Sequence, residues 1–459
     1  MLSRQSTKSR VRFSQHVRVG KDIVELLSSA MYVDPLCIFR EYIQNAADSL
    51  DEAAERALYR NGVQPTIQIT LDPAPANRIV KIRDTGAGIS RTTFQQTLTA
   101  IGASHKRGTP ARGFRGVGRL AGLGQCQTLV MLSKSDDDSV VSSMQWDCRR
   151  LKELLLETSD LSLDQMLQQV VEIDELPPDG HPKHFFEIEM RNVRRHKNDD
   201  LLNESVVGEY LSQVAPVRFH PSFSFGAEIE AYLAQYQSAK TYQLTVNGKP
   251  IYRPFQNTYE ARPKVHGEFK KVEYFEVPGV ASGTDAVGWI LHSDYLGAIP
   301  DRHGIKGLRL RSGNIQIGDA RLLDSVFPEP RFNAWTVGEC HVLTSKLVPN
   351  ARRDDFEHNG HYDNLVRKLT PKGKEIAKSC RDSSAERARR RQQTAAARNA
   401  NGNNFDWPKA KNFFQKNSSK KVTQPHKRQI QTLLRGVATY AQIVRSLIGE
   451  PEPTKHTPP

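Results

Sequence analysis

The chain has 459 residues, a length that allows two or three domains of roughly 100–200 residues each and excludes a single small module. It carries 65 Lys and Arg against 51 Asp and Glu, and its five cysteines form no C-x-x-C or Cys/His cluster, which argues against a disulfide framework and against a zinc site. No segment approaches the roughly 18 consecutive apolar residues of a membrane span, and the basic amino terminus lacks an apolar export core. We therefore expect a soluble, cytoplasmic protein that makes no membrane contact.

The first 200 residues predict a mixed α/β domain from their apolar periodicity. Helices are expected at 21–32, 39–61 and 91–102, and strands at 66–71, 79–84, 126–135, 140–146 and 184–193. The stretch 103–124 between them is rich in glycine and arginine, too polar for a core and too dense in glycine for a regular element before Val117.

Residues 201–365 predict a smaller domain that is richer in strands. A helix at 207–217 is expected to lead into strands at 242–252, 270–279, 286–292, 307–318 and 340–349. Within the first of these, Asn247-Gly248 is a strong hairpin signal. The remaining residues, 366–459, predict a tail that is disordered in its middle and ends in a helix with one apolar face, 428–449.

The positive charge is concentrated in this tail. Residues 366–459 contain 21 Lys and Arg against 6 Asp and Glu, a net charge of +15, whereas residues 1–365 contain 44 against 45, a net charge of −1. A nearly neutral body with a basic tail predicts that the body performs the chemistry and that the tail meets an anionic partner such as nucleic acid, in the nucleoid or the nucleus. The alternative is a solvated extension that only keeps the protein soluble.

The expected helix at 39–61 places three polar residues on one stripe. At 100° per residue, Glu41, Asn45 and Asp48 share one side of the helix, opposite an apolar face. A solvated surface stripe is the plain interpretation. However, a glutamate close to a γ-phosphate can polarise the attacking water, and an asparagine one turn later can supply a neutral oxygen to Mg²⁺.

A second motif follows the expected strand 79–84. Asp84 at the strand end can accept a hydrogen bond from the exocyclic amine of adenine, while Gly86 and Gly88 would let a flat base lie against the backbone. Alone, Asp-x-Gly-x-Gly is usually a turn.

A third motif is the G-x-x-G-x-G of Gly113, Gly116 and Gly118, whose backbone N–H groups can approach phosphates. It is not a Rossmann fingerprint, because no strand immediately precedes it and no βαβ unit surrounds it, and the chain has no G-x-x-x-x-G-K-[ST] P-loop motif. The order and spacing of the three motifs favour a nucleotide site over three unrelated turns.

Together these motifs resemble the GHKL ATPases with the Bergerat ATP-binding fold, which include ninety-kilodalton heat-shock chaperones, MutL mismatch-repair proteins, type II topoisomerase ATPase subunits, MORC proteins and histidine kinases. REYIQNAADSLD is similar to the family's helix with Glu, Asn and Asp, DTGAGIS to its adenine-binding motif, and IGASHK with GFRGVGRLAGLG to its lid and second glycine motif. The resemblance covers residues 39–124. It implies a Bergerat-fold α/β sandwich ATPase domain at 1–200, a smaller α/β transducer (middle-type) domain at 201–365, and a basic, partly disordered helical tail at 366–459.

The resemblance also implies roles for individual residues. Glu41 would be the general base, Asn45 the Mg²⁺ ligand and Asp84 the adenine anchor. The further residues implied to bind ATP are Asp48, Gly86, Gly88, Gly102, Ser104, Lys106, Gly113, Phe114, Arg115, Gly116, Val117 and Gly118. The family's Gly-Thr in the last strand is matched by His184-Phe185, which leaves one adenine-side hydrogen bond unassigned. Because Glu41 is retained and no helical H-box is found, ATP hydrolysis is expected rather than histidine-kinase activity.

In residues 201–365 the resemblance is weaker. LVPNARRDDFE is similar to the heat-shock middle-domain segment in which an arginine follows an asparagine by three residues, which implies that Arg353 reaches the γ-phosphate. Arg352 and the MutL-like Lys306 are alternatives, and both arginines can instead be surface charges paired with neighbouring aspartates. A cation that arrives across a domain interface would make hydrolysis conditional on closure.

The sequence therefore predicts a Mg²⁺-dependent ATPase switch. ATP would order a lid at 101–118, bring the two domains together and favour a transient homodimer. The expected output is heat-shock-chaperone-like remodelling of a protein client or partner subunit. The alternatives are a nucleic-acid-associated, MutL- or MORC-like clamp in DNA repair or antiviral defence, which the basic tail favours, and a nucleotide-sensing scaffold with little turnover.

Overall fold

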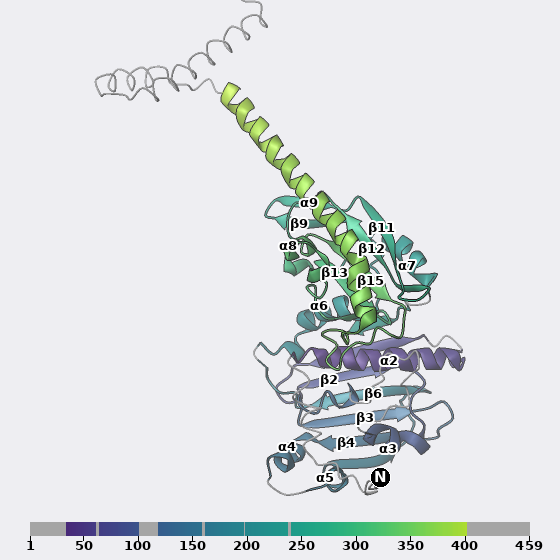
Figure 1. Cartoon of the computed structure of the whole chain (residues 1–459). Helices are drawn as coiled ribbons and strands as arrows, with labels where there is room; N and C mark the ends of the chain where they lie inside the picture. The colour runs from purple at the N-terminus through teal and green to yellow at the C-terminus, as the bar shows by residue number, and fades with distance from the viewer. Residues whose placement is uncertain are drawn as a thin grey trace, which may run out of the picture. The chain divides into compact units, whose positions relative to one another are not determined.

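The computed structural model describes residues 34–60, 64–100, 118–157, 161–196, 198–236 and 240–401 (Figure 1). The described residues up to Ala385 belong to one compact unit, and those from Glu386 onward belong to a second. The first unit contains two large β-sheets with helices packed on them, so the mixed α/β architecture expected from the sequence is confirmed. Within the described ranges, no helix is long and apolar enough to cross a membrane.

The first sheet has eight described strands in the order β5-β4-β3-β6-β2-β1-β7-β8. Their bounds are β1 Thr66–Asp72, β2 Ile79–Asp84, β3 Thr128–Lys134, β4 Val141–Asp147, β5 Val171–Leu176, β6 Phe185–Arg191, β7 Gln243–Val246 and β8 Lys249–Pro250. All neighbours pair antiparallel except β1 and β7, which run parallel. The chain therefore returns to the first sheet after leaving it, and the expected Asn247-Gly248 hairpin, with φ of 48° and 77°, joins β7 to β8.

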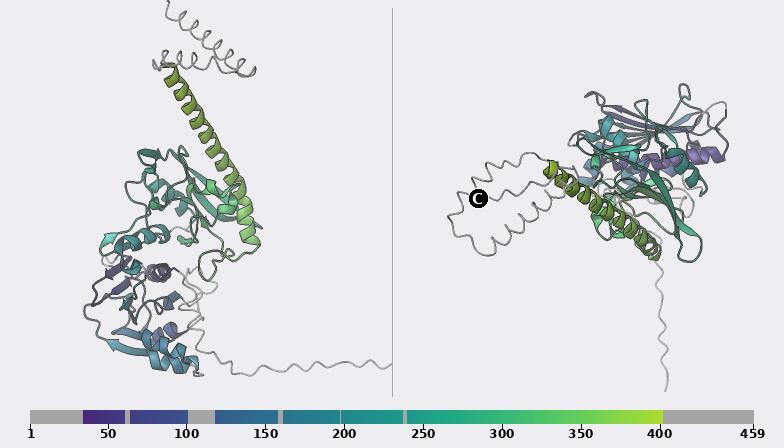
Figure 2. Two further views of the ribbon diagram at one scale, coloured as in Figure 1. Left: turned by 90° about the vertical axis from the view of Figure 1, so that its left-hand side faces the viewer. Right: turned by 90° about the horizontal axis from the view of Figure 1, so that it is seen from above.

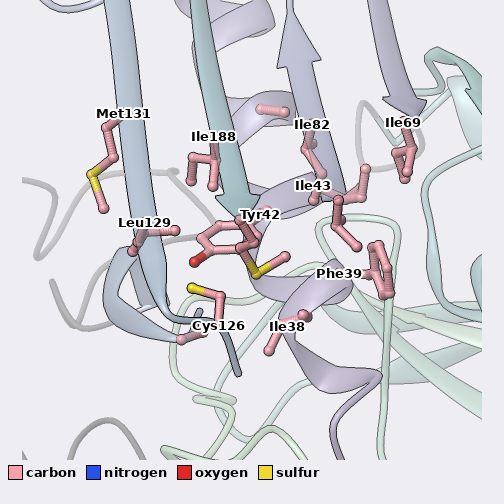
Figure 3. Packing of buried hydrophobic residues seen from close by; sticks show 14 of the residues in the cluster. Ile38, Phe39, Tyr42, Ile43, Ile69, Ile82, Cys126, Leu129, Met131 and Ile188 are labelled. Atoms are coloured by element: carbon pink, nitrogen blue, oxygen red, sulfur yellow. The ribbon is translucent and has the colours of Figure 1, made fainter. Parts of the chain in front are cut away.

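Helices of the first sheet are α2 Cys37–Glu55, α3 Arg91–Thr99, α4 Cys148–Leu156, α5 Leu163–Val170 and α6 Glu204–Val214, with short 3-10 turns η2 Gly118–Leu120 and η3 Asp200–Leu202. Figure 3 shows how α2 packs: Tyr42 and Ile43 lie against Ile82 of β2 and Ile188 of β6. The apolar face of α2 is thus buried against the sheet. Its polar stripe is left on the other side of the helix, where it is available for chemistry.

The second sheet has the strand order β11-β12-β15-β13-β14. Its elements are β11 Lys271–Pro278, β12 Thr284–His292, β13 Gly307–Ser312, β14 Ile315–Ile317 and β15 Val337–Val342, with α7 Gly226–Ala234, α8 Pro330–Asn333, η4 Asp301–His303, η5 Asp324–Val326 and the β9–β10 hairpin Thr258–Arg262 and Val265–Glu268. Along β12, Trp289 packs in one apolar cluster and Ile290 in another, so this strand is covered on both faces.

Helix α9, Gly360–Asn401, is continuous through Pro371 (Figures 1 and 2). Its first part buries Leu365, Leu369 and Ile376 in the core of the second sheet. From Arg381 to its end, α9 contains no Val, Leu, Ile, Met or aromatic residue. The basic segment therefore starts inside a helix whose beginning is core, while the helix expected at 428–449 and the one at 21–32 lie outside the described residues.

A buried ionic network joins the segment after α6 to the second sheet. Glu339 is fully buried; its Oε1 accepts a hydrogen bond from Arg311 Nε at 2.6 Å, and its Oε2 pairs with Arg253. Arg311 also donates to the carbonyl of Gln213 at 2.5 Å, just before the end of α6. Burial alone would raise the pKa of Glu339, but Arg253 and Arg311 hold it well below its usual range. The network fixes the second sheet to the end of α6 through a charge that stays ionised.

Candidate functional site

The turn after β2 is seated directly on α2. The Ala87 amide donates to the carbonyl of Ser49 on α2 at 3.0 Å, and a Cβ at Gly86 would lie 2.1 Å from Ser49 Oγ. Asp84 is 3% exposed, and its Oδ1 accepts a hydrogen bond from the Gly86 amide at 2.8 Å. The carboxylate expected to bind adenine is therefore held beside the polar stripe of α2, and glycine is needed for the approach.

Gly88 is enclosed on the other side of the turn. It has φ of +69°, and a Cβ there would lie 2.1 Å from the carbonyl oxygen of Lys134 and 2.9 Å from that of Phe185. The next amide, of Ile89, donates to Ser133 Oγ at 2.7 Å. The turn is thus wedged between the end of β3 and the start of β6.

The base side of the turn departs from the family pattern. The β2–β6 ladder places Phe186, one residue beyond the expected His184-Phe185 match, directly opposite Asp84. Directly opposed residues of an antiparallel pair share one face of the sheet, and the half-buried Phe186 packs against the core under α2. His184 is 3% exposed and lies with its Nδ1 2.8 Å from the carbonyl oxygen of Gly86. The ring of Phe186 therefore lies beside Asp84 on the neighbouring strand, while His184 contacts the backbone of the turn at Gly86.

Glu41 lies between two segments that are distant in the sequence. Its side chain is buried, with Oε1 3.3 Å from Arg353 Nε. On the other side, a Cβ at Gly118 would lie 2.6 Å from Glu41 Oε2, so this glycine permits the start of η2 to approach the carboxylate. Arg40 reinforces the junction because it donates to the carbonyls of Arg352 at 2.7 Å and Arg353 at 3.3 Å.

Arg353 is held in a strained backbone conformation. Its φ is +56°, its amide donates to Asn350 O at 3.2 Å, and its carbonyl accepts from the Gly318 amide at 2.9 Å. A non-glycine residue in this region costs about 1–3 kcal/mol and is often found at functional sites. Arg352 is exposed and Lys306 pairs with Asp301. Of the three cations suggested by the sequence, Arg353 is the one whose side chain meets Glu41.

Asn45 and Asp48 continue the stripe along α2. Asp48 is 7% exposed, whereas Asn45 is half-buried and its side chain makes no hydrogen bond to another described residue. A neutral amide oxygen on the same face as a buried carboxylate suits Mg²⁺, which binds through one or two protein oxygens plus phosphates and waters. The remaining expected ATP-binding residues, Gly102, Ser104, Lys106, Gly113, Phe114, Arg115, Gly116 and Val117, lie outside the described residues.

Two side chains that sequence patterns did not single out fix the segment after Val117 to α2 and α3. Tyr42 OH accepts a hydrogen bond from the Gly122 amide at 2.7 Å and donates to the carbonyl of Arg119 at 3.4 Å. Arg119 donates to the carbonyls of Leu98, at 3.2 Å, and Ala100. Burial lowers the pKa of Arg119 to about 10. In the sequence, Tyr42 belongs to the apolar face of α2. Its hydroxyl group was the one feature that could have indicated a hydrogen-bonding role.

Comparison with known proteins places this geometry in a family. The family model described as "Histidine kinase-, DNA gyrase B-, and HSP90-like ATPase" matches residues 38–176, a range that includes α2, the Asp84 turn, η2 and β1 to β5. This part of the chain matches the GHKL superfamily. The GHKL membership expected from the sequence is therefore confirmed. Because this family description spans kinases as well as ATPases, it establishes a nucleotide-binding fold and leaves the reaction to the site residues.

The GHKL domain also has a chaperone relative. The chain is similar to "Chaperone protein HtpG" of Alkaliphilus oremlandii (strain OhILAs), with 24% identity over an alignment of 195 residues; the match covers 39% of this chain and 30% of that protein. The chain therefore matches less than a third of the length of that relative.

Proposed function

We propose that the protein binds Mg²⁺-ATP between α2 and the Asp84 turn and hydrolyses it. The observation that supports this most is the meeting of Glu41 and Arg353 at 3.3 Å, beside the close approach of Gly118 to Glu41 Oε2. A buried carboxylate, a buried guanidinium and a glycine backbone are what phosphoryl transfer to water needs: a base, a positive charge and space for phosphate.

In this proposal each residue of the chain has one task. Asp84 accepts the exocyclic amine of adenine, whose ring lies against the backbone of Gly86 and Gly88. Glu41 accepts a proton from the water that attacks the γ-phosphorus; the bond to the β,γ-bridging oxygen breaks, and ADP and phosphate leave. When bound, Mg²⁺ held by the amide oxygen of Asn45 would neutralise phosphate charge.

Arg353 makes hydrolysis depend on the second sheet. In the structure its guanidinium lies against Glu41. When ATP binds, the side chain can turn so that its positive charge contacts the γ-phosphate. The loop that carries Arg353 is held by Gly318, just after β14, and by Arg40 on α2. A shift of this loop would therefore connect the nucleotide state to the second sheet, which gives the conformational switch.

The experiment is a steady-state ATPase assay of Glu41→Ala against wild type, with ATP affinity measured by calorimetry. We expect kcat to fall roughly 100-fold or more, as for loss of a general base, with ATP affinity retained. Glu52→Ala is the matched control, because Glu52 is an exposed glutamate of the same helix, paired only at the surface with Arg56. Equal turnover of Glu41→Ala and wild type would rule out Glu41 as the base.

The output that we propose is remodelling of a protein client or partner subunit, with a transient homodimer in the ATP state and a cytoplasmic location. The support is the similarity to a chaperone protein and the arginine loop joined to α2. The measurement is ATPase stimulation by an unfolded client protein compared with stimulation by duplex DNA. Stimulation by DNA alone would contradict the chaperone-like output.

A second candidate output, a nucleic-acid-associated clamp, is favoured by the second half of α9. Arg389, Arg390 and Arg391 are exposed, and Glu386 is the last acidic residue of the helix. Such a helix can neutralise phosphates, and the slope of log K against log salt should become shallower by about 0.9 for each phosphate of duplex DNA that is no longer neutralised. Replacing the three arginines by glutamine and measuring DNA binding at several salt concentrations tests this output; an unchanged slope would remove it.

A further inference from the structure

Gln44, three residues after Glu41 on α2, is a buried amide whose side chain has no hydrogen-bond partner among the described residues. It lies on α2 and is 1% exposed, and neither its Oε1 nor its Nε2 has a partner among the described residues. Glu41 Oε1 is also buried and accepts no hydrogen bond of good geometry, although Arg353 Nε is 3.3 Å away. Side chains three residues apart on a helix are neighbours, with Cβ atoms about 5–6 Å apart. An unused donor and an unused acceptor therefore share one helical turn.

Burying an amide in this way is unfavourable. A buried polar group without a partner costs about 1–3 kcal/mol, and an apolar side chain of the same shape, such as methionine, avoids that cost. The fold does satisfy a buried glutamine elsewhere: Gln316 accepts a hydrogen bond from Arg309 at 2.9 Å and donates to the carbonyl of Gly318 at 3.0 Å. The unsatisfied amide at Gln44 thus suggests a partner in another state of the site.

The neighbouring groups identify which state that is. Arg353 Nε, at 3.3 Å, is nearer to Glu41 Oε1 than Arg40 Nε, at 4.0 Å, and hydrolysis as proposed above requires the charge of Arg353 at the γ-phosphate instead. Glu41 would then keep only the longer ion pair with Arg40 Nε, at 4.0 Å, and weakening the pairing of a buried carboxylate is strongly unfavourable. The Nη1 and Nη2 atoms of Arg40 donate to the carbonyls of Arg353 and Arg352, which holds its Nε at 4.0 Å from Glu41 Oε1, beyond hydrogen-bond distance. Gln44 is a fully buried neutral donor within one turn of Glu41, whereas the amide of Asn45 is half-buried and is assigned to Mg²⁺ above.

We infer that Gln44 is a positioning residue for Glu41. When Arg353 turns to the phosphate, Gln44 Nε2 donates to Glu41 Oε1 and leaves the second carboxylate oxygen directed at the attacking water. A neutral amide suits this task because it fixes the carboxylate without cancelling the negative charge that draws the proton. Gln44 takes part in no bond making or breaking, and the inference rests on the proposed hydrolysis.

The test compares Gln44→Met with Gln125→Met in the full-length protein. Gln125 is a matched control, since it is also a buried glutamine whose Oε1 has no described partner. For Gln44→Met we expect a melting temperature equal to or above wild type, unchanged ATP affinity and KM, and a kcat lowered by about 10- to 100-fold, the range for loss of an outer group that orients a site residue. Gln125→Met should keep the wild-type kcat.

A second variant separates positioning from packing. Gln44→Glu has the same shape but donates only when protonated, so its kcat relative to wild type should rise as the pH is lowered. A merely structural role would give a ratio independent of pH. A flat ratio, or a Gln44→Met protein with wild-type kcat, would overturn the inference.

The control for the underlying chemistry is Glu41→Ala. If Glu41→Ala keeps full turnover, the proposed hydrolysis mechanism fails first. If Glu41→Ala loses turnover while Gln44→Met does not, the mechanism stands and the role of Gln44 is refuted. If both lose turnover, the double variant should lose no more than Glu41→Ala alone, because the amide acts through that carboxylate.

Discussion

Replacing Gly88 by alanine tests how closely the Asp84 turn is enclosed. The new methyl group would lie 2.1 Å from the carbonyl oxygen of Lys134, 2.8 Å from its carbon and 2.9 Å from the carbonyl oxygen of Phe185. All three are backbone atoms of β3 and β6, which cannot rotate away as a side chain can. The left-handed φ of +69° adds about 1–2 kcal/mol for a non-glycine residue, and overpacking adds about 1–3 kcal/mol, so the free energy of unfolding should fall by about 2–5 kcal/mol.

Gly180 provides the matched control for this variant. It has φ of +77°, but a Cβ there would meet no atom within 4 Å. Gly180→Ala should therefore show only the backbone term of about 1–2 kcal/mol. Urea denaturation followed by circular dichroism measures both variants, and ATP affinity should weaken only for Gly88→Ala. Two variants that differ by less than about 0.5 kcal/mol, the usual scatter between independent sites, would refute the close approach.

Arg40→Gln should lower the free energy of unfolding by about 2–4 kcal/mol, because two carbonyls of the Arg353 loop lose a charged donor. Limited proteolysis measures the loosening of this loop, and cleavage at residues 350–356 should be faster than in wild type. Burial lowers the pKa of His341 from 6.5 to about 4. As the pH falls from 6.5 to 4, the unfolded chain binds a proton at this histidine and the folded chain does not, so the free energy of unfolding should decrease by about 3 kcal/mol. Urea denaturation at pH 7 and pH 5 should show a smaller loss for His341→Gln than for wild type. Tyr42→Phe removes the acceptor of the Gly122 amide and should cost about 1–3 kcal/mol, measured by calorimetry; no change in melting temperature would contradict that hydrogen bond.

Local patterns predicted most of the first sheet. The expected strands 66–71 and 79–84 correspond to β1 and β2, and three later ones correspond to β3, β4 and β6 within two residues at their ends. Strand β5 was missed because it is an edge strand with mostly exposed residues, so its sequence has no buried alternation. The helix expected to end near residue 61 ends at Glu55, and Ala57 two residues later adopts a φ of 53°. This left-handed conformation is typical of glycine, so an alanine at this position does not predict it.

The site was predictable only in part. The stripe of α2 and the Asp84 turn are local, so their spacing made Glu41, Asn45 and Asp84 candidates, and the resemblance to the GHKL family implied their roles. The ion pair of Arg353 with Glu41 depends on a left-handed arginine and on the carbonyls held by Arg40, which no local pattern encodes. Gln44 was invisible for a different reason: a polar residue on a helix is assumed to meet solvent, and here the tertiary structure buries it.

The parallel pairing of β7 with β1 has a practical consequence for dissecting the molecule. A fragment that stops at residue 200 would strip two strands from the first sheet and leave the Ile67–Ile69 side of β1 as an open edge, ready to associate with other chains. Expression boundaries are better set beyond β8, so that the nucleotide-binding half carries its own closing hairpin. The same pairing means that recombination between relatives at residue 200 would exchange part of the first sheet along with the second.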